Sequence, residues 1–428
     1  MRKGIASLAF VLLVVGCKVG GGLDGCSPPT KFPVAFALSK DESRGISIVG
    51  EGRECVPGGL YINPLFCHTL LLATFDFQWN IANLFTVPVT YFQQMGKYSS
   101  SKILLTADNS RLIISEPIYV IDMKTKGMQV ISSITNTADL VLSPDGSTVL
   151  GLSYQNGEFF SLNPKTMNVT KLSLGLYPTT PIFSWEYGGS KFSYPSLIHI
   201  VGDKAWFLDP LNKRILSINY KTMVYLQEFP IDNAYYGLDI SPDGTMGVAY
   251  WPNIFSEGHF HTTTVSLVTF STSSIKTFAI DVSYDSPMAS AILMTDGTIL
   301  VTTDSLGYVI DPATDTIYQD IRCGDSVYGY YSGYGLARNF DGTKVFNFTR
   351  RGTIGSIISK DSCQWDNGLY GYNDPFLFDL PIISRYQDGF YFAQNGFDSN
   401  NSRESISFGF YDAITNSRSY TPISVRCQ

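Results

Sequence analysis

Charge is scarce in this 428-residue chain: Asp, Glu, Lys and Arg make up 16% of it, and acidic residues outnumber basic ones by 37 to 30. No basic run or stripe is present to follow a nucleic-acid backbone, and the formal charge of −7 opposes such binding. Histidine is also rare, with four residues, and no Cys/His spacing suits zinc or a redox pair. We therefore expect no nucleic-acid partner.

The chain lacks an apolar run long enough to cross a bilayer. Arg2 and Lys3 precede an apolar stretch from Ile5 to Val15, which is too short for a stable transmembrane helix. A basic start, a short apolar segment and a small residue before Cys17 together predict an export signal over residues 1–16.

The end of that signal, Val14-Val15-Gly16-Cys17, resembles the lipobox of bacterial lipoproteins. In that family the Cys becomes the first residue and carries a diacylglycerol, so the resemblance implies lipidation of Cys17 and a membrane anchor of acyl chains. Lys18 after the Cys, rather than Asp, favours the outer membrane, in periplasmic or surface-facing orientation. The alternative is an ordinary signal peptide with an unmodified Cys. Residues 17–33, rich in Gly and Pro, predict a flexible tether.

Lipidation would use one of the seven cysteines and leave six. An even remainder in an exported protein favours disulfides, although six thiols allow fifteen connectivities. Cys55 and Cys67 bracket one Gly/Pro-containing insertion at about residues 50–68 and form the first expected pair. The other two expected pairs are Cys323 with Cys363, and Cys26 with Cys427.

Two sequence marks recur along the chain. The first is a hairpin with a Pro-Asp-Gly turn, LVLSPDGSTVLGLSY at Leu140–Tyr154, which returns at Leu238–Trp251, Ala291–Thr303 and Leu336–Thr349. The second is a strand that ends in Asp or Asn before a short polar turn, as in YVIDMKT at Tyr119–Thr125. The marks alternate with a mean spacing of about 48 residues, and no convincing amphipathic helix separates them.

Four short strands per unit, repeated at this period, predict an all-β chain folded as a β-propeller of four-stranded blades over residues 34–428. Weaker marks at Phe36–Val49 and Leu70–Gln78 favour eight blades. Seven remain if residues 31–98 are an N-terminal embellishment. A pair of β-sandwich domains is the alternative fold, but it predicts no shared period.

The SPDG turn followed by YVID and a Thr three residues later resembles the bacterial YVTN-type repeat family, over roughly residues 100 to 420. The resemblance implies a propeller and says little about activity. It also implies that the two repeated turns lie on one face of the disc, and that the other connections lie on the opposite face.

Those other connections are rich in Tyr, Gly, Asn and Ser, a composition that makes adaptable contact surfaces. We therefore expect a non-catalytic scaffold in the bacterial cell envelope that binds a protein, peptide or glycan partner, although the same residues also suit packing at the tops of blades. The candidate binding residues are Tyr235, Tyr236, Trp251, Tyr328, Tyr330, Tyr331, Tyr334, Tyr370 and Tyr372.

Catalytic motifs are missing: the sequence has no GxSxG elbow, HExxH helix or phosphate-binding P-loop. In the SPDG turn Gly146 directly follows Asp145, unlike in the Asp box of sialidase-type propellers, so we expect these turns to be structural. Glu257, His259 and His261 alternate and form a weak candidate metal site. We predict no cofactor. The alternative function is a metal-dependent hydrolase or lactonase with a divalent metal in the central channel.

Overall fold

The computed structural model describes residues 30–424 with internal gaps. The gaps are 43, 55–61, 64–68, 77–80, 89–102, 116–117, 136, 138, 154–155, 176–183, 188–189, 194–196, 234, 236, 251–260, 283–287, 304–306, 322–332, 340–343, 350–353, 360–361, 367–381, 384, 388, 397–404, 413 and 415–416. The predicted signal, most of the tether, and residues 55–68 apart from Ile62 and Asn63 lie outside the described part.

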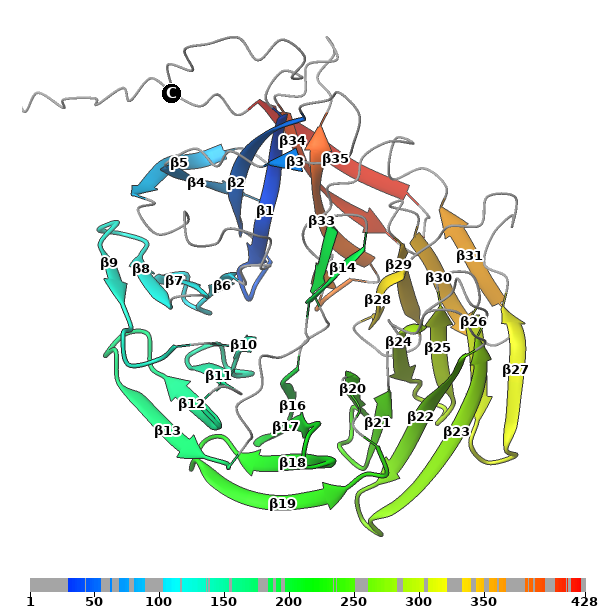
Figure 1. Cartoon of the computed structure of the whole chain (residues 1–428). Helices are drawn as coiled ribbons and strands as arrows, with labels where there is room; N and C mark the ends of the chain where they lie inside the picture. The colour runs from blue at the N-terminus through cyan, green and yellow to red at the C-terminus, as the bar shows by residue number, and fades with distance from the viewer. Residues whose placement is uncertain are drawn as a thin grey trace, which may run out of the picture.

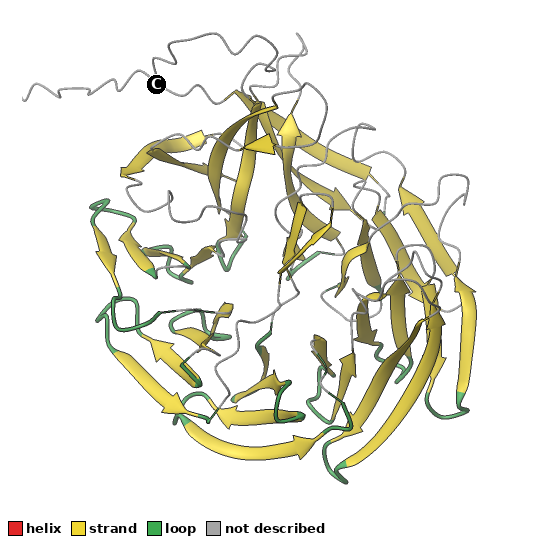
Figure 2. Cartoon of the chain, in the orientation of Figure 1, coloured by secondary structure: helices red, strands yellow, loops and turns green. Residues whose placement is uncertain are grey.

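The described chain is built from β-strands, and within it no helix is long and apolar enough to cross a membrane (Figure 2). The first half of the chain forms β1 (Thr30–Leu38), β2 (Arg44–Glu54), β3 (Ile62–Asn63), β4 (Thr69–Asp76), β5 (Ile81–Pro88), β6 (Ile103–Leu105), β7 (Arg111–Ile114), β8 (Tyr119–Asp122), β9 (Met128–Val130), β10 (Asp139–Leu142), β11 (Val149–Ser153), β12 (Glu158–Leu162), β13 (Val169–Ser173), β14 (Ser184–Tyr187), β15 (Ser190–Ser193), β16 (His199–Val201), β17 (Lys204–Asp209), β18 (Arg214–Asn219) and β19 (Val224–Pro230).

The second half forms β20 (Gly237–Ile240), β21 (Met246–Tyr250), β22 (His261–Thr269), β23 (Ser274–Val282), β24 (Met288–Leu293), β25 (Ile299–Thr303), β26 (Gly307–Asp311), β27 (Thr316–Ile321), β28 (Gly333–Arg338), β29 (Val345–Thr349), β30 (Ile354–Ser359), β31 (Ser362–Asp366), β32 (Ile382–Ile383), β33 (Gly389–Gly396), β34 (Ser405–Asp412) and β35 (Ser417–Ser424).

These strands form eight sheets of four strands or more in the described residues, plus the separate hairpin β14–β15. In each sheet the strands follow one another in chain order, except that the first sheet runs β1-β2-β4-β5 with β3 added beside β2. The sheets are arranged around a centre, with first strands such as β6, β10 and β20 inside and last strands such as β9, β13 and β23 outside (Figure 1). The predicted all-β chain of four-stranded units is confirmed.

The SPDG turn closes the hairpin as its sequence requires. Leu142 pairs with Val149, and Gly146 adopts φ +72°, a left-handed conformation that Gly reaches without steric cost. Asp145 Oδ1 accepts hydrogen bonds from the Ser143 hydroxyl at 2.5 Å and from the Ser147 N–H at 3.0 Å. The structural role expected for Asp145 is therefore observed.

The second mark is a turn of the same self-contained kind. Asp122 Oδ1 accepts the N–H groups of Lys124 and Thr125 at 2.9 and 2.8 Å, an Asx-type turn that leads into Lys126 at φ +62°. Asn163 and Asn219 accept the corresponding pairs of N–H groups in the sheets β10–β13 and β16–β19. These sheets thus carry turns that stabilise themselves locally.

The core lies between neighbouring sheets. One cluster joins Ile113 and Val120 of the β6–β9 sheet to Leu140 and Phe160 of the β10–β13 sheet, and all four are at most 1% exposed. Burial of each such side chain contributes about 1.5–3 kcal/mol. A sheet packed on both faces needs apolar residues at successive positions, which explains the continuous apolar runs. Gly151 is required here, because a β-carbon would lie 2.0 Å from the Phe160 ring.

Candidate functional site: the loop face

The antiparallel topology divides the connections between two faces. In each sheet the link between the first and second strands and the link between the third and fourth lie at one end, which we call the turn face. The link between the second and third strands and the link to the next sheet lie at the other end, the loop face. Among the described residues, the loop face therefore includes 131–135, 156–157, 210–213 and 231–233.

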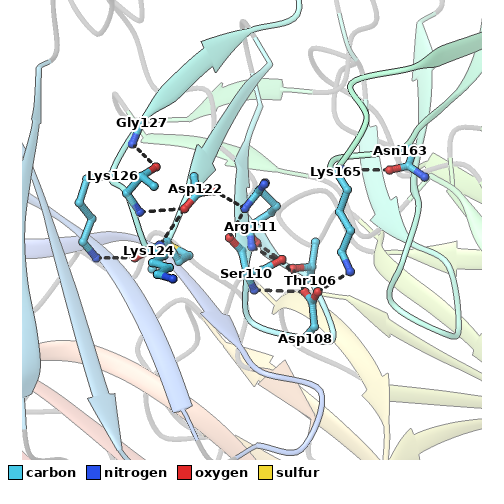
Figure 3. A network of polar contacts seen from close by, with 12 residues as sticks. Thr106, Asp108, Ser110, Arg111, Asp122, Lys124, Lys126, Gly127, Asn163 and Lys165 are labelled. Carbon is cyan, nitrogen blue, oxygen red and sulfur yellow. Dashed lines mark hydrogen bonds and ion pairs between the residues drawn. The ribbon is translucent and has the colours of Figure 1, made fainter.

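Polar side chains of the turn face are engaged with one another (Figure 3). Asp108 accepts the Thr106 hydroxyl at 2.8 Å and forms an ion pair with Lys165 of the next sheet at 2.7 Å. The Lys165 ammonium, followed by the hydroxyl and amide donors, holds the pKa of Asp108 well below its usual range. Arg111 pairs with Asp122 at 2.5 Å. These contacts connect turns and support a structural role.

Tyr235 is the predicted binding residue whose side chain the structure describes, and it lies in the core instead of at the surface. Its side chain is 0% exposed and belongs to the core cluster that includes Trp206, Phe229 and Phe270 between two sheets. Burial raises the pKa of the Tyr235 phenol. The expectation of a surface contact at Tyr235 is therefore corrected: this ring anchors the loop-face connection to the sheets beneath it.

A small polar cluster also holds the connection between β19 and β20. The Asp232 carboxylate accepts hydroxyl hydrogen bonds from Tyr235 at 2.8 Å, Ser266 at 3.1 Å and Thr277 at 2.8 Å. Burial opposes ionisation of Asp232, but these three donors outweigh it, and the pKa is lowered. Since Asp232 is exposed while Ser266 is fully buried, the cluster fixes a charged group on the loop face between the sheets β16–β19 and β20–β23.

A second loop-face connection is held by side chains from the adjacent turn. The Thr135 carbonyl accepts hydrogen bonds from the Ser153 hydroxyl and the Asn156 side-chain amide, both at 3.1 Å. Thr135 and Asn156 are exposed. The connection therefore presents polar groups in a fixed arrangement.

A charged network lies at the loop-face end of β18. The Arg214 guanidinium bonds to Asp209 at 2.9 Å and to Glu228 at 2.6 Å, and Glu228 also accepts the Tyr225 hydroxyl at 3.1 Å. Burial lowers the pKa of Arg214, but the two carboxylates more than compensate and raise it. The turn beside it leaves Leu211 exposed.

Two carboxylates on the first strands of their sheets connect those sheets to others. Asp139 on β10 accepts the N–H groups of Leu197 and Ile198 at 2.7 and 3.1 Å. Asp239 on β20 accepts the Leu293 N–H at 2.8 Å and forms an ion pair with Arg338 on β28. Both carboxylates thus have partners within the fold, and we assign them no acid–base role.

Sequence reasoning did not find Asp139 and Asp239 as residues that connect sheets. Asp239 stands at the repeat position that Val141 occupies in the β10–β13 sheet, so a charged residue in an otherwise apolar strand was the available signal. Its partner Arg338 lies 99 positions later, and no local pattern connects the two.

The remaining predicted residues fall where the structure describes less. Tyr334 lies on β28, His261 begins β22 and Cys363 lies on β31, but their side chains are outside the described part. In the described residues no three His, Cys, Asp or Glu side chains gather as metal ligands. Outside the described residues are Tyr236, Trp251, Tyr328, Tyr330, Tyr331, Tyr370, Tyr372, Glu257, His259, Cys17, Cys26, Cys55, Cys67, Cys323 and Cys427.

No protein-family model and no curated protein matches the sequence. Solved structures do match the fold. The match to the Dos1 propeller covers 90% of this chain and 91% of the Dos1 chain, with a TM-score of 0.50 and 14% sequence identity. The match to the dihydro-heme d1 dehydrogenase NirN in complex with DHE covers 92% of this chain and 78% of the NirN chain, with a TM-score of 0.50 and 12% sequence identity. At these identities the likeness concerns the fold alone. Together with the sheet topology, it shows that the chain is a β-propeller.

Proposed function

We propose that this protein is a bacterial cell-envelope lipoprotein whose propeller binds a protein, peptide or glycan partner through its loop face, without catalysis. In this proposal Cys17 carries the lipid, residues 17–33 form the tether, and the eight sheets are eight blades of YVTN type. The six other cysteines form disulfides.

The contrast between the two faces is the observation that carries the proposal. On the turn face the carboxylates accept hydrogen bonds within turns that recur from sheet to sheet, as at Asp108, Asp122 and Asp145. On the loop face the connections differ from one another in length and sequence, and Asp232 and Asn156 stand exposed on anchored backbone. A surface that varies over a regular support is the usual form of a binding site on a repeat scaffold.

The aromatic loop residues supply the proposed contact area. Tyr330 and Tyr331 lie in SVYGYYSGYG, Ser326–Gly335, and Trp251 lies in WPNIFSEGHFH, Trp251–His261. Tyr and Trp bury a large area at a low entropy cost and offer one polar atom each, so they often dominate binding energy. Tyr235 is excluded from this set because it is buried.

A pulldown from envelope extract tests the loop face. We expect the intact chain to recover a partner, and the double variant Tyr330→Ala/Tyr331→Ala to lose most of that recovery. Lys124→Ala, an exposed change on the turn face, is the matched control and should recover the partner normally. Equal recovery with all three proteins would contradict the proposed face.

The lipid anchor has a separate test. Cys17→Ser should abolish incorporation of a labelled fatty acid and release the protein from the membrane fraction, because a thiol is needed to carry the diacylglycerol. Unchanged labelling of this variant would overturn the assignment of Cys17.

A further inference from the structure

The propeller ring is closed where its first and last sheets meet. Each sheet is built from one continuous part of the chain: the first from residues 30–88 and the last from residues 382–424. In the described residues no strand of one end completes the sheet of the other. The ring is therefore closed by contacts of β1 with β33 and β34, a joint that we call the seam.

At other joints the turn-face hairpins of neighbouring sheets meet through a glycine. The Gly146 carbonyl accepts the Ala107 N–H of the preceding sheet at 3.0 Å, and a β-carbon on Gly146 would lie 2.6 Å from the Ala107 β-carbon. Gly244 occupies the same turn position, and a β-carbon there would lie 3.2 Å from Val201 of the preceding sheet. The residue at this position thus faces the preceding sheet.

Glu42 occupies that position at the seam. It has φ +56°, close to the φ +58° of Asn109 at the same position of the next sheet. For a residue with a β-carbon this left-handed conformation is costly, and Glu gains none of the local hydrogen bonding that helps Asn. Lys126 and Met167 adopt the same conformation in their turns, at φ +62° and φ +61°, so the role of Glu42 depends on what its side chain contacts.

The Glu42 side chain makes its contact with the last sheet. Glu42 is 5% exposed, and its Oε1 accepts the backbone N–H of Arg385 at 2.5 Å. The carboxylate also faces the Tyr391 phenol, whose pKa is raised by burial and then by the Glu42 charge. Beside it, the Tyr386 hydroxyl donates to the Lys40 carbonyl at 3.0 Å. Segments from the two ends of the sequence are thus joined across the seam.

We propose that Glu42 is a latch that closes the propeller ring, and that the seam is the joint at which the ring opens when this latch is lost. A buried carboxylate that accepts a backbone N–H is a strong, charge-assisted link, and its loss leaves the Arg385 amide without that acceptor. Because no strand is shared across the seam in the described residues, loss of the link is not offset by a continuous ladder of backbone hydrogen bonds.

Three variants separate the latch from the backbone conformation. Glu42→Gly removes the side chain but relieves the positive φ, so it stabilises the turn if the side chain has no role. Asn109→Gly makes the same relief one sheet away, where no latch is proposed. Glu42→Gln keeps the length of the side chain and tests the charge, and it also serves if Glu42→Gly fails to fold.

Hydrogen exchange of the full-length protein measures the opening of the seam. We expect Glu42→Gly to speed exchange in peptides of β1 and β33 by roughly tenfold, while peptides of β10–β13 keep their rates. Glu42→Gln should show a smaller increase in the same peptides, and Asn109→Gly should show none there. Exchange at the seam that is unchanged in both Glu42 variants, or acceleration spread evenly over all sheets, would overturn the latch.

Discussion

The turn face and the loop face of this propeller differ in how regularly their polar side chains are held by hydrogen bonds. On the turn face the same short solution recurs: Ser143 and Asp145 in one sheet are matched by Ser241 and Asp243 in another, with a left-handed Gly after each Asp. On the loop face each connection is held differently, by Asp232 and Tyr235 in one place and by Asn156 in another. Repetition marks the structural support, and the variable face is the one that we propose as the binding surface.

Loss of the Tyr235 ring should have the largest effect on stability. Tyr235→Ala leaves a cavity between two sheets, and we expect a loss of about 3–5 kcal/mol in the free energy of unfolding, measured by chemical denaturation. Tyr235→Phe keeps the ring and removes only the hydroxyl, which donates to a carboxylate, so it should cost about 1.5–3 kcal/mol. If the two variants lose the same amount, the ring does not anchor the loop-face connection.

The turn face should be nearly as sensitive at its glycines. Gly146→Ala places a β-carbon against Ala107 in a left-handed conformation, and we expect a cost of about 1–3 kcal/mol or more. Gly175 on the loop face is the control, because it has φ +60° but a β-carbon added there would meet no atom within 4 Å. Gly175→Ala should cost clearly less. Equal costs would mean that the close contact between neighbouring turns contributes nothing.

Stability should fall in acid because the turn carboxylates are held ionised. Hydrogen bonds from Ser143 and Ser241 lower the folded-state pKa values of Asp145 and Asp243. Their contribution is therefore present above the unfolded-state pKa of about 3.9 and is lost as the pH falls through the lower folded value. Denaturation midpoints recorded from pH 7 to pH 2 should drop below about pH 4. The double variant Asp145→Asn/Asp243→Asn should show a shallower drop, and an identical profile would refute this origin.

The ion pair between neighbouring turns should matter least. Lys165 and Asp108 are 62% and 42% exposed, so solvent screens their attraction. Lys165→Ala should cost about 0.2–1 kcal/mol, and less in high salt. A loss larger than that of Gly146→Ala would reverse the order of effects expected for the turn face.

The regular part of the molecule could be predicted from the sequence because that part depends on local chemistry. The turn at Asp145 and the Asx turn at Asp122 depend on hydrogen bonds between neighbouring residues, so the local sequence was sufficient to predict them. Tyr235 was assigned to the surface because it lies in a polar Tyr-rich stretch. The signal missed was its position four residues after the buried Ile231, since an earlier connection also holds two buried residues close together, Ile131 and Ile134, three positions apart.

Contacts between distant segments were beyond sequence reasoning. Arg338 meets Asp239, and Glu42 meets Arg385, only because the ring brings inner strands and end sheets together. A period of repeated marks fixes which strands pair, but it does not say which exceptional side chains meet across sheets. Glu42 and Asp239 could be recognised in the sequence as departures from the repeat. The residues that they contact could not be identified from the sequence.

Hydrogen exchange of the full chain with and without its recovered partner tests most directly whether the loop face is the binding surface. We predict protection in loop-face peptides covering residues 232–237, 251–261 and 326–335, with no change in turn-face peptides covering residues 106–111, 143–148 and 241–246. Protection confined to the turn-face peptides would contradict a loop-face site.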